Sequence, residues 1–88
     1  MPYRVDLHRE ARKELDQLPS QAYRLLAAAI DRLAEEPRPR GSLKLVGHQD
    51  LWRIRVGRYR IIYHTDDVHQ QLTVLRVALR TEHTYRDL

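Results

Sequence analysis

The chain of 88 residues contains no cysteine. It therefore has no disulfide framework and no thiolate metal site, and its composition gives no sign of an oxidising compartment. It also lacks a recognisable signal peptide, and no apolar run approaches the length needed to cross a membrane. We expect a single cytoplasmic domain over residues 1–88, large enough to fold alone and without contact to a membrane.

Acidic side chains are almost missing from one segment. Between residues 38 and 60 a single acid, Asp50, stands among seven basic residues, which gives this segment a net charge of +6 in a chain whose total is +4. All the excess positive charge therefore lies in one contiguous part of the sequence. Such a concentration indicates contacts with phosphate groups more than it serves general solubility.

The centre of this segment is typical of a β-hairpin over residues 52–63. Polar and apolar residues alternate on both sides of Gly57, and a type II′ turn requires glycine at the first of its two central positions. A two-residue loop of this kind places Arg55 opposite Arg60. The face that joins the core carries Trp52, Ile54, Val56, Tyr59, Ile61 and Tyr63. The other face carries Arg53, Arg55 and Arg60.

The arginine face is the more informative of the two. Like charges directly opposite each other destabilise a strand pair by about 0.2 to 1 kcal/mol, and Arg55 faces Arg60. A sequence selected only for folding would carry an acid at one of these positions. A solvated polar face is the alternative, but three converging cations favour a binding surface for a polyanion.

Periodicity predicts the elements that precede the hairpin. Residues 3–7 alternate as a short strand, and residues 9–18 change to helical spacing that a proline ends. Ser20 is the expected N-cap of a second helix that runs to residue 35 or 36, and the short connection makes the two helices an antiparallel hairpin. Residues 37–42 form a linker, and residues 43–51 are ambiguous.

A further strand is expected over residues 71–80, after a turn at Asp66 and Asp67. Its alternating faces are Thr73, Leu75, Val77 and Leu79 on one side, and Leu72, Val74, Arg76, Ala78 and Arg80 on the other. If the first set joins the core, Arg76 and Arg80 lie on the same side as the hairpin arginines. Residues 81–88 form one turn of helix or stay loose.

The fold class is therefore α+β. We expect an N-terminal strand, an antiparallel hairpin of two helices, and then an antiparallel sheet of at least three strands. The helices cover one face of this sheet, and the opposite face is basic and open.

These residues resemble a known family. Residues 52–63 (WRIRVGRYRIIY), followed by residues 75–80 (LRVALR) and Tyr85, are similar to the core signature of the RelE/ParE superfamily of bacterial toxins from toxin–antitoxin systems. The resemblance extends over essentially the whole chain, including the stretch at residues 34–39 (AEEPRP). It implies a RelE-like fold and a place nearer the RelE branch, whose members are ribosome-dependent messenger RNA endonucleases.

The resemblance assigns catalytic roles to five positions. They are Arg53, Arg55, Arg60, Arg80 and Tyr85. The implied reaction is attack of an RNA 2′-hydroxyl on the adjacent phosphate, which expels the 5′-oxygen and leaves a cyclic phosphate without a metal or another cofactor. The arginines would stabilise the transition state through forked, charge-assisted hydrogen bonds. Further side chains are expected to bind the substrate: Arg38, Arg40, Lys44, Arg58, Arg76 and His83.

The chain departs from well-studied members of that branch where they carry lysines. Arg53 and Arg55 stand at those positions, and a guanidinium with a pKa above about 12 cannot act as a general base. Three tail residues are candidates for that role: Tyr85, His83 and Glu82. We rank Tyr85 above His83, because a lone histidine in a terminal segment is more often merely solvated.

The resemblance also implies partners. A cognate antitoxin would cover the basic face or displace the tail, and the ribosome would present messenger RNA in its A site. The complex of toxin and antitoxin commonly binds operator DNA and represses its own operon.

Other interpretations stay open. The ParE branch contains inhibitors of DNA gyrase without nuclease activity, for which the arginine face would be a docking surface. A nucleic-acid-binding module without toxicity is a third alternative. A metal site built from His64, Asp66, Asp67 and His69 is disfavoured, since two adjacent aspartates between strands are ordinary turn residues.

Overall fold

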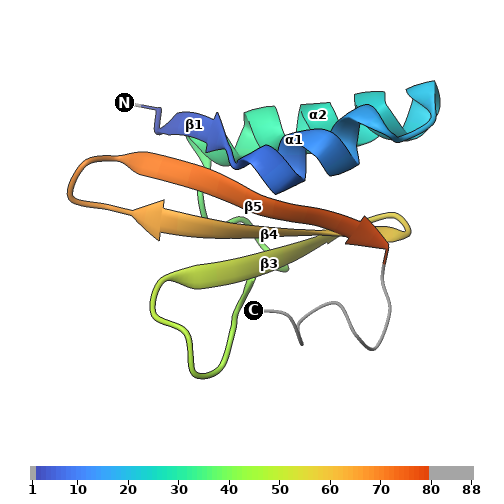
Figure 1. The fold of residues 1–88 in the computed structure, drawn as a ribbon. Helices are drawn as coiled ribbons and strands as arrows, with labels where there is room; N and C mark the ends of the chain where they lie inside the picture. Colours follow the sequence, from blue (N-terminus) through green and yellow to red (C-terminus); the bar gives the residue numbers. More distant parts are fainter. Residues whose placement is uncertain (1, 80–88) are drawn as a thin grey trace.

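The computed structural model describes residues 2–79, and its two helices lie together on one face of a sheet (Figure 1). The elements are β1 (Arg4–Leu7), α1 (Arg9–Asp16), α2 (Ser20–Glu35), β2 (Leu43–Lys44), β3 (Leu51–Val56), β4 (Tyr59–Asp66) and β5 (Gln71–Leu79). The predicted α+β fold, with an N-terminal strand, two helices and then the sheet, is confirmed.

The sheet has five strands in the order β1-β5-β4-β3-β2. β3 is antiparallel to β4, β4 is antiparallel to β5, and β2 adds only two antiparallel residues beside β3. β1 pairs with β5 in parallel, from Arg4 opposite Gln71 to Leu7 opposite Val74. A parallel pair needs a long connection, and here the whole of the intervening chain supplies it. The ambiguous residues 43–51 contain β2, a loop and the first residue of β3.

The helix boundaries differ slightly from the predicted ones. α1 begins after His8, whose ring Nδ1 accepts the backbone N–H of Glu10 at 3.2 Å. It ends at Asp16, two residues earlier than expected. The N-cap of α2 is Pro19 and not Ser20, because the carbonyl of Pro19 already accepts the N–H of Tyr23 at 2.9 Å.

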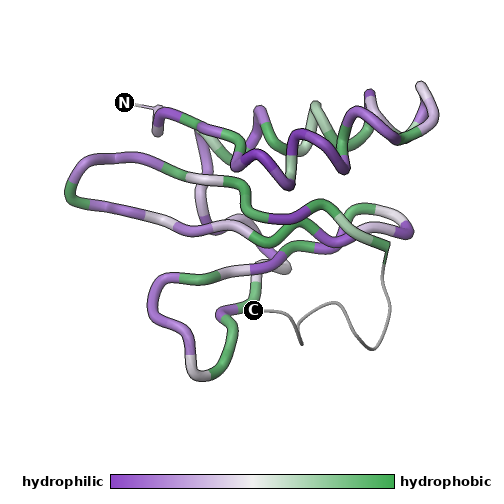
Figure 2. The backbone as a smooth tube through the Cα atoms, in the orientation of Figure 1, coloured by the Kyte–Doolittle hydropathy of each residue, from purple (hydrophilic) through white to green (hydrophobic). Residues whose placement is uncertain are grey.

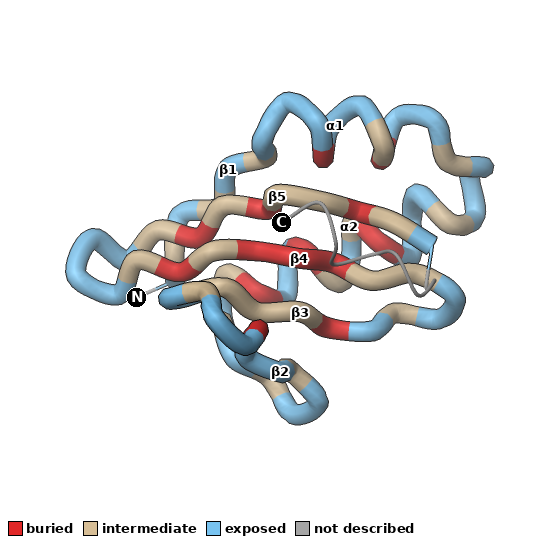
Figure 3. Tube along the Cα trace, turned by 60° about the horizontal axis from the view of Figure 1, so that its bottom comes forward, coloured by how far each residue is buried: buried red, intermediate tan, exposed pale blue. Residues whose placement is uncertain are grey.

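The core lies between the helices and one face of the sheet. α1 is largely hydrophilic on its outer side (Figure 2), and the longest buried run of the sheet lies on β4 (Figure 3). Burying each of the larger apolar side chains contributes about 1.5 to 3 kcal/mol before the cost of ordering it. The buried cluster consists of Ala11, Leu15, Leu26, Ile30, Leu33, Ile54, Ile61, Tyr63, Leu72, Val74 and Val77.

The predicted hairpin is confirmed in its register. Arg55 lies opposite Arg60, and the turn residues are Gly57 and Arg58. Gly57 has a φ of +58°, whereas Arg58 is not among the residues with positive φ. A positive φ at the first central position alone is what a type II′ turn requires.

The predicted faces of β5 are wrong in the first half of the strand. A bulge shifts its register with β4 between Ile62 and Tyr63, so that Ile62 faces Arg76 while Tyr63 faces Val74. The strand therefore changes face at Leu75. Simple alternation could have buried only half of the apolar residues, whereas the bulge turns Leu72, Val74, Val77 and Leu79 all toward the helices.

No helix within residues 2–79 is long and apolar enough to span a lipid bilayer.

Candidate nucleic-acid interface

The sheet face that the helices leave open carries the hairpin arginines. Because register aligns side chains across neighbouring strands, this face consists of rows that cross β3, β4 and β5. Two successive rows are Arg53–Ile62–Arg76 and Arg55–Arg60–Ala78. The structure thus brings together three of the five predicted catalytic residues, and we call Arg53, Arg55 and Arg60 the arginine face.

Arg53 offers a hydrogen-bond donor on this face. Its side chain is half-buried, and its Nε atom is buried without a hydrogen-bond partner in the part of the chain that the structure describes. A buried donor left unsatisfied costs about 1 to 3 kcal/mol. The positive charge of this guanidinium favours an anionic ligand on the same face. Arg55 is exposed and Arg60 is half-buried.

Several carboxylates have partners away from the arginine face. Asp67 forms an ion pair with Arg38 at 3.1 Å, Glu14 forms one with Arg76, and Asp66 is hydrogen-bonded to the ring of His69 at 2.8 Å. The hydrogen bond from His69 holds the pKa of Asp66 below its usual value. These three carboxylates are therefore engaged at the β4–β5 turn and on α1.

Arg38, a predicted substrate-binding residue, lies on the helix side of the sheet. Its guanidinium stands 5.5 Å from the ring centre of Trp52 and donates to Thr65 at 3.4 Å and to Asp67 at 3.1 Å. Trp52 and Thr65 belong to the core-facing rows, opposite the arginine face. The hydroxyl of Tyr3 also donates to Asp67, at 2.6 Å, and with Arg38 it lowers the pKa of that carboxyl.

Three other candidate substrate-binding residues have different positions. Lys44 is exposed and pairs with Trp52, which puts it in a core-facing row, and Arg58 is exposed in the hairpin turn. Arg76 starts in the same row as Arg53, but its guanidinium binds the carboxylate of Glu14 at 2.9 Å. Substrate binding by these residues stays a prediction.

An open groove of about 1110 Å³ runs between β3 and α2. β2 pairs with β3 only at Trp52 and Arg53, so within residues 2–79 the outer edge of β3 has no neighbouring strand beyond them. Both faces of β3 therefore reach the groove. Its lining combines apolar residues of α2 with cations of β3 and of the linker, and with two acids at the end of α2. These residues include Leu25, Ala28, Leu33, Glu35, Glu36, Arg40, Arg53 and Arg55.

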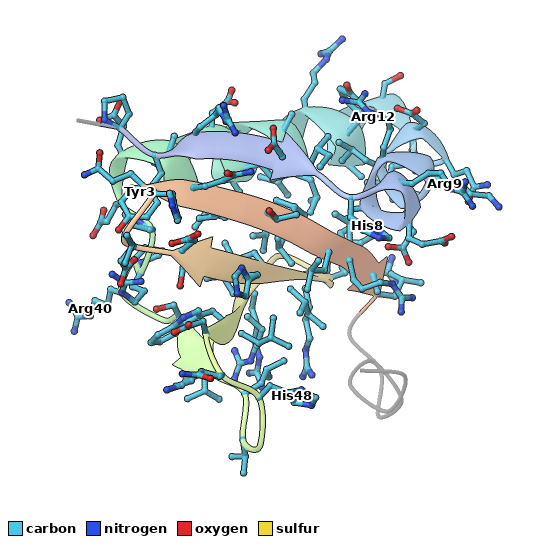
Figure 4. All side chains as sticks on the ribbon, turned by 60° about the vertical axis from the view of Figure 1, so that its left-hand side comes forward. Tyr3, His8, Arg9, Arg12, Arg40 and His48 are labelled. Carbon is cyan, nitrogen blue, oxygen red and sulfur yellow. The ribbon has the colours of Figure 1, made fainter. Side chains whose placement is uncertain are left out.

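Figure 4 separates two groups of polar residues. Arg9 and Arg12 project from α1, whereas Arg40 and His48 lie near β2 and the loop that follows it. The cations of α1 are therefore remote from the groove and can serve as controls for charge alone.

Four predicted residues lie outside the described part of the chain. They are Arg80, Glu82, His83 and Tyr85. Their roles as catalytic, base or substrate-binding groups stay predictions.

The turn interpretation of the His and Asp cluster agrees with the structure. Asp66 ends β4, and its carboxylate accepts both the backbone N–H and the ring nitrogen of His69. Asp67 binds Tyr3 and Arg38 instead. Across residues 2–79, no group of three or more His, Asp or Glu side chains is arranged to hold a metal ion.

Two contacts were not predicted from the sequence. Glu14 reaches β5, and the hydroxyl of Tyr63 donates to the carbonyl of Pro37 at 2.7 Å. Periodicity shows which face of an element is apolar, but it does not show which polar groups meet across the fold. The groove was missed for the same reason.

Comparison with known proteins finds similarity to toxins of toxin–antitoxin systems. Residues 5–83 match the family described as ParE toxin of type II toxin-antitoxin system, parDE. Toxin RelG of Mycobacterium tuberculosis is 34% identical over 86 residues, which cover 93% of this chain and 95% of RelG.

Solved structures show the same relationship. A chain of the archaeal RelE-RelB complex from Pyrococcus horikoshii OT3 aligns with a TM-score of 0.82 and 36% identity, covering 93% of this chain and 99% of that one. The isolated E. coli RelE toxin aligns with a TM-score of 0.77 and 28% identity, covering 97% and 93% of the two chains.

Fold and sequence together define a small α+β toxin of a type II toxin–antitoxin system. The chain belongs to the ParE toxin family. Within the RelE/ParE superfamily it lies nearer the RelE branch, because its relatives include RelG and RelE.

Proposed function

We propose that the chain is a ribosome-dependent endoribonuclease that cleaves messenger RNA on its arginine face. One observation carries the proposal: Arg53, Arg55 and Arg60 occupy adjacent rows of one sheet face. Phosphate groups match such donors in charge and in geometry.

The chemistry needs few groups from the protein. The 2′-oxygen attacks the adjacent phosphorus, and a bond from phosphorus to the 2′-oxygen forms while the bond to the 5′-oxygen breaks. A base takes the proton of the 2′-hydroxyl, and water supplies the proton that the leaving 5′-oxygen gains. The arginines hold the phosphate and neutralise the charge that accumulates on it in the transition state. The base is proposed to be Tyr85, with His83 and Glu82 as the alternatives.

The ribosome is proposed to orient the RNA in its A site. Orientation of the 2′-oxygen in line with the leaving group can supply much of the rate enhancement. A site whose charged groups are mainly arginines depends on such positioning, because guanidinium groups stabilise charge but do not exchange protons at neutral pH.

The proposed inhibitor is a cognate antitoxin that occupies the groove between β3 and α2. The archaeal relative was solved as a RelE-RelB complex, which supports an antitoxin as partner. The outer edge of β3 offers backbone groups to an extended segment, and Arg53 and Arg55 offer positive charge to its acidic side chains. Occupation of this groove would withdraw two arginines from RNA. Binding of the complex to operator DNA is a further part of this proposal.

Inhibition of DNA gyrase is the second candidate function. The family whose sequence model matches is named after ParE, and the notable charge of the face would then serve for docking on a protein.

A reconstituted assay tests the nuclease proposal. Purified toxin is mixed with a short message, either bare or bound to ribosomes, and the 3′ ends of the products are analysed. We expect cleavage of the ribosome-bound message only, with 2′,3′-cyclic phosphate ends, and a loss of at least about 100-fold for Arg60→Ala. Arg12→Ala, on the exposed side of α1, is the matched control and should cleave normally. Intact message in this assay, together with loss of DNA supercoiling when the toxin is added to purified gyrase in a parallel assay, would instead support the second candidate.

A further inference from the structure

Glu14 on α1 makes four hydrogen bonds to β5. Its carboxylate oxygens accept from Nε of Arg76 at 3.2 and 3.1 Å and from Nη2 at 2.9 Å, and Oε1 also accepts from the backbone N–H of Val77 at 2.9 Å. The side chains of Arg76 and Glu14 are only 30% and 23% exposed. Charge-assisted bonds with limited access to water are among the stronger hydrogen bonds of a protein.

These bonds lie at the part of β5 that no longer has β1 as a neighbouring strand. β1 accompanies β5 only as far as Leu7 opposite Val74, and α1 then continues along the same edge of the sheet (Figures 1 and 3). The N–H of Val77 points out of the sheet at this edge, where Glu14 accepts it. The carboxylate thus replaces the missing strand as a partner of β5.

The same bonds follow directly on the bulge at Leu75. The bulge sets which residues of β5 face the helices and which face the arginine side, and a slip of one residue would exchange the two sets. Glu14 holds the first two residues after the bulge. Ala78 then lies opposite Arg60, in the row that also contains Arg55.

We propose that Glu14 is a positioning residue for the arginine face. By fixing Arg76 and Val77 it sets the register and position of β5 beside Arg60, and it keeps the guanidinium of Arg76 directed toward α1. Arg76 then acts through Glu14 and not on the RNA. This inference rests on the proposed RNA cleavage, because a positioning role has meaning only for a reacting site.

Single-turnover cleavage of ribosome-bound message tests the inference. Wild type, Glu14→Ala and Ile30→Ala are compared over a range of toxin concentrations, and the melting temperature of each is measured. Ile30 is buried on α2, whereas Glu14 belongs to α1, so Ile30→Ala is a control for stability lost elsewhere. Glu14→Gln, which keeps an oxygen acceptor for Val77, serves if Glu14→Ala does not fold.

We expect Glu14→Ala to lower the maximal cleavage rate about tenfold, and Glu14→Gln about threefold, with the half-saturating toxin concentration changed by less than about twofold. Ile30→Ala should keep the wild-type rate at temperatures where it is folded. Rates of the Glu14 variants within about twofold of wild type, or reduced only as much as that of Ile30→Ala, overturn the inference alone. A wild-type toxin that leaves the message intact overturns the proposed function, and the inference with it.

Discussion

At the scale of single residues, Tyr63 connects the centre of the sheet to the linker that follows α2. Its side chain is fully buried, burial raises its pKa to about 12, and its hydroxyl donates to the carbonyl of Pro37 at 2.7 Å. Tyr63→Phe leaves that carbonyl without its partner, and we expect a loss of about 1 to 3 kcal/mol in the free energy of unfolding. Urea unfolding measures it. Tyr59→Phe, at a half-buried position of the same strand, should cost clearly less, and equal losses would contradict the assignment.

Asp67, also a single residue, is expected to make the stability of the fold depend on pH. Hydrogen bonds from Tyr3 and Arg38 hold its pKa below the usual 3.8. A depressed pKa in the folded state means stability that is present above pH 3.8 and is lost as the pH falls through the lower, folded value.

We therefore expect Asp67→Asn to be less stable than wild type near pH 7, with a difference that shrinks once the pH falls below about 4. Unfolding by urea at a series of pH values measures both proteins under the same conditions. Because the hydrogen bonds between Asp66 and His69 are present in both, their contribution cancels. A difference that stayed constant down to pH 3 would show that the charge of Asp67 is not what matters.

At the scale of elements, the hairpin of β3 and β4 carries like charges that are expected to serve RNA binding and to lower stability. Arg55 directly faces Arg60, so Arg55→Glu puts opposite charges across these two strands in place of like charges. We expect this cross-strand change to contribute about 0.2 to 1 kcal/mol to stability, and we expect the variant to lose RNA cleavage. Thermal unfolding and the ribosome assay measure the two effects. Arg12→Glu, which makes the same change of charge on α1, should still cleave, and cleavage by Arg55→Glu would contradict a role for Arg55.

The elements also differ in how far the sequence predicts them. The hairpin could be predicted in full, because alternation, Gly57 and a two-residue loop are all local signals. β5 could be predicted only as a strand. Its bulge at Leu75 is set by apolar residues that must all meet the helices, and by Glu14, which is 62 positions from Arg76 in the chain. The parallel pairing of β1 with β5 is equally non-local.

At the scale of the whole molecule, the groove joins the helical layer to the arginine face. Leu25 lines it from α2 and is half-exposed, while Arg53 and Arg55 line it from β3. Leu25→Asp replaces an apolar contact on the α2 side of the groove by a negative charge. We expect it to weaken the complex with the cognate antitoxin at least about tenfold and to leave cleavage of ribosome-bound message unchanged. Titration of antitoxin into the cleavage assay measures both. Normal inhibition of Leu25→Asp would place the antitoxin elsewhere.

The site as a whole could be predicted only in part. Composition located the positive charge, and strand alternation assembled Arg53, Arg55 and Arg60 on one face. The sequence could not show that Arg38 crosses to the helix side over Trp52, because that position depends on where the linker meets the sheet. Nor could it show that Arg76 turns away to Glu14.

The central claim is that the arginine face cleaves messenger RNA. Primer extension on total messenger RNA, after brief induction of the chain in growing bacteria, tests it most directly, with Arg60→Ala, Arg80→Ala and Arg12→Ala induced in parallel. We predict cuts within translated codons for wild type and Arg12→Ala, and no cuts for the other two variants. Growth arrest with intact messages and relaxed or broken DNA would contradict the claim and would identify gyrase as the target.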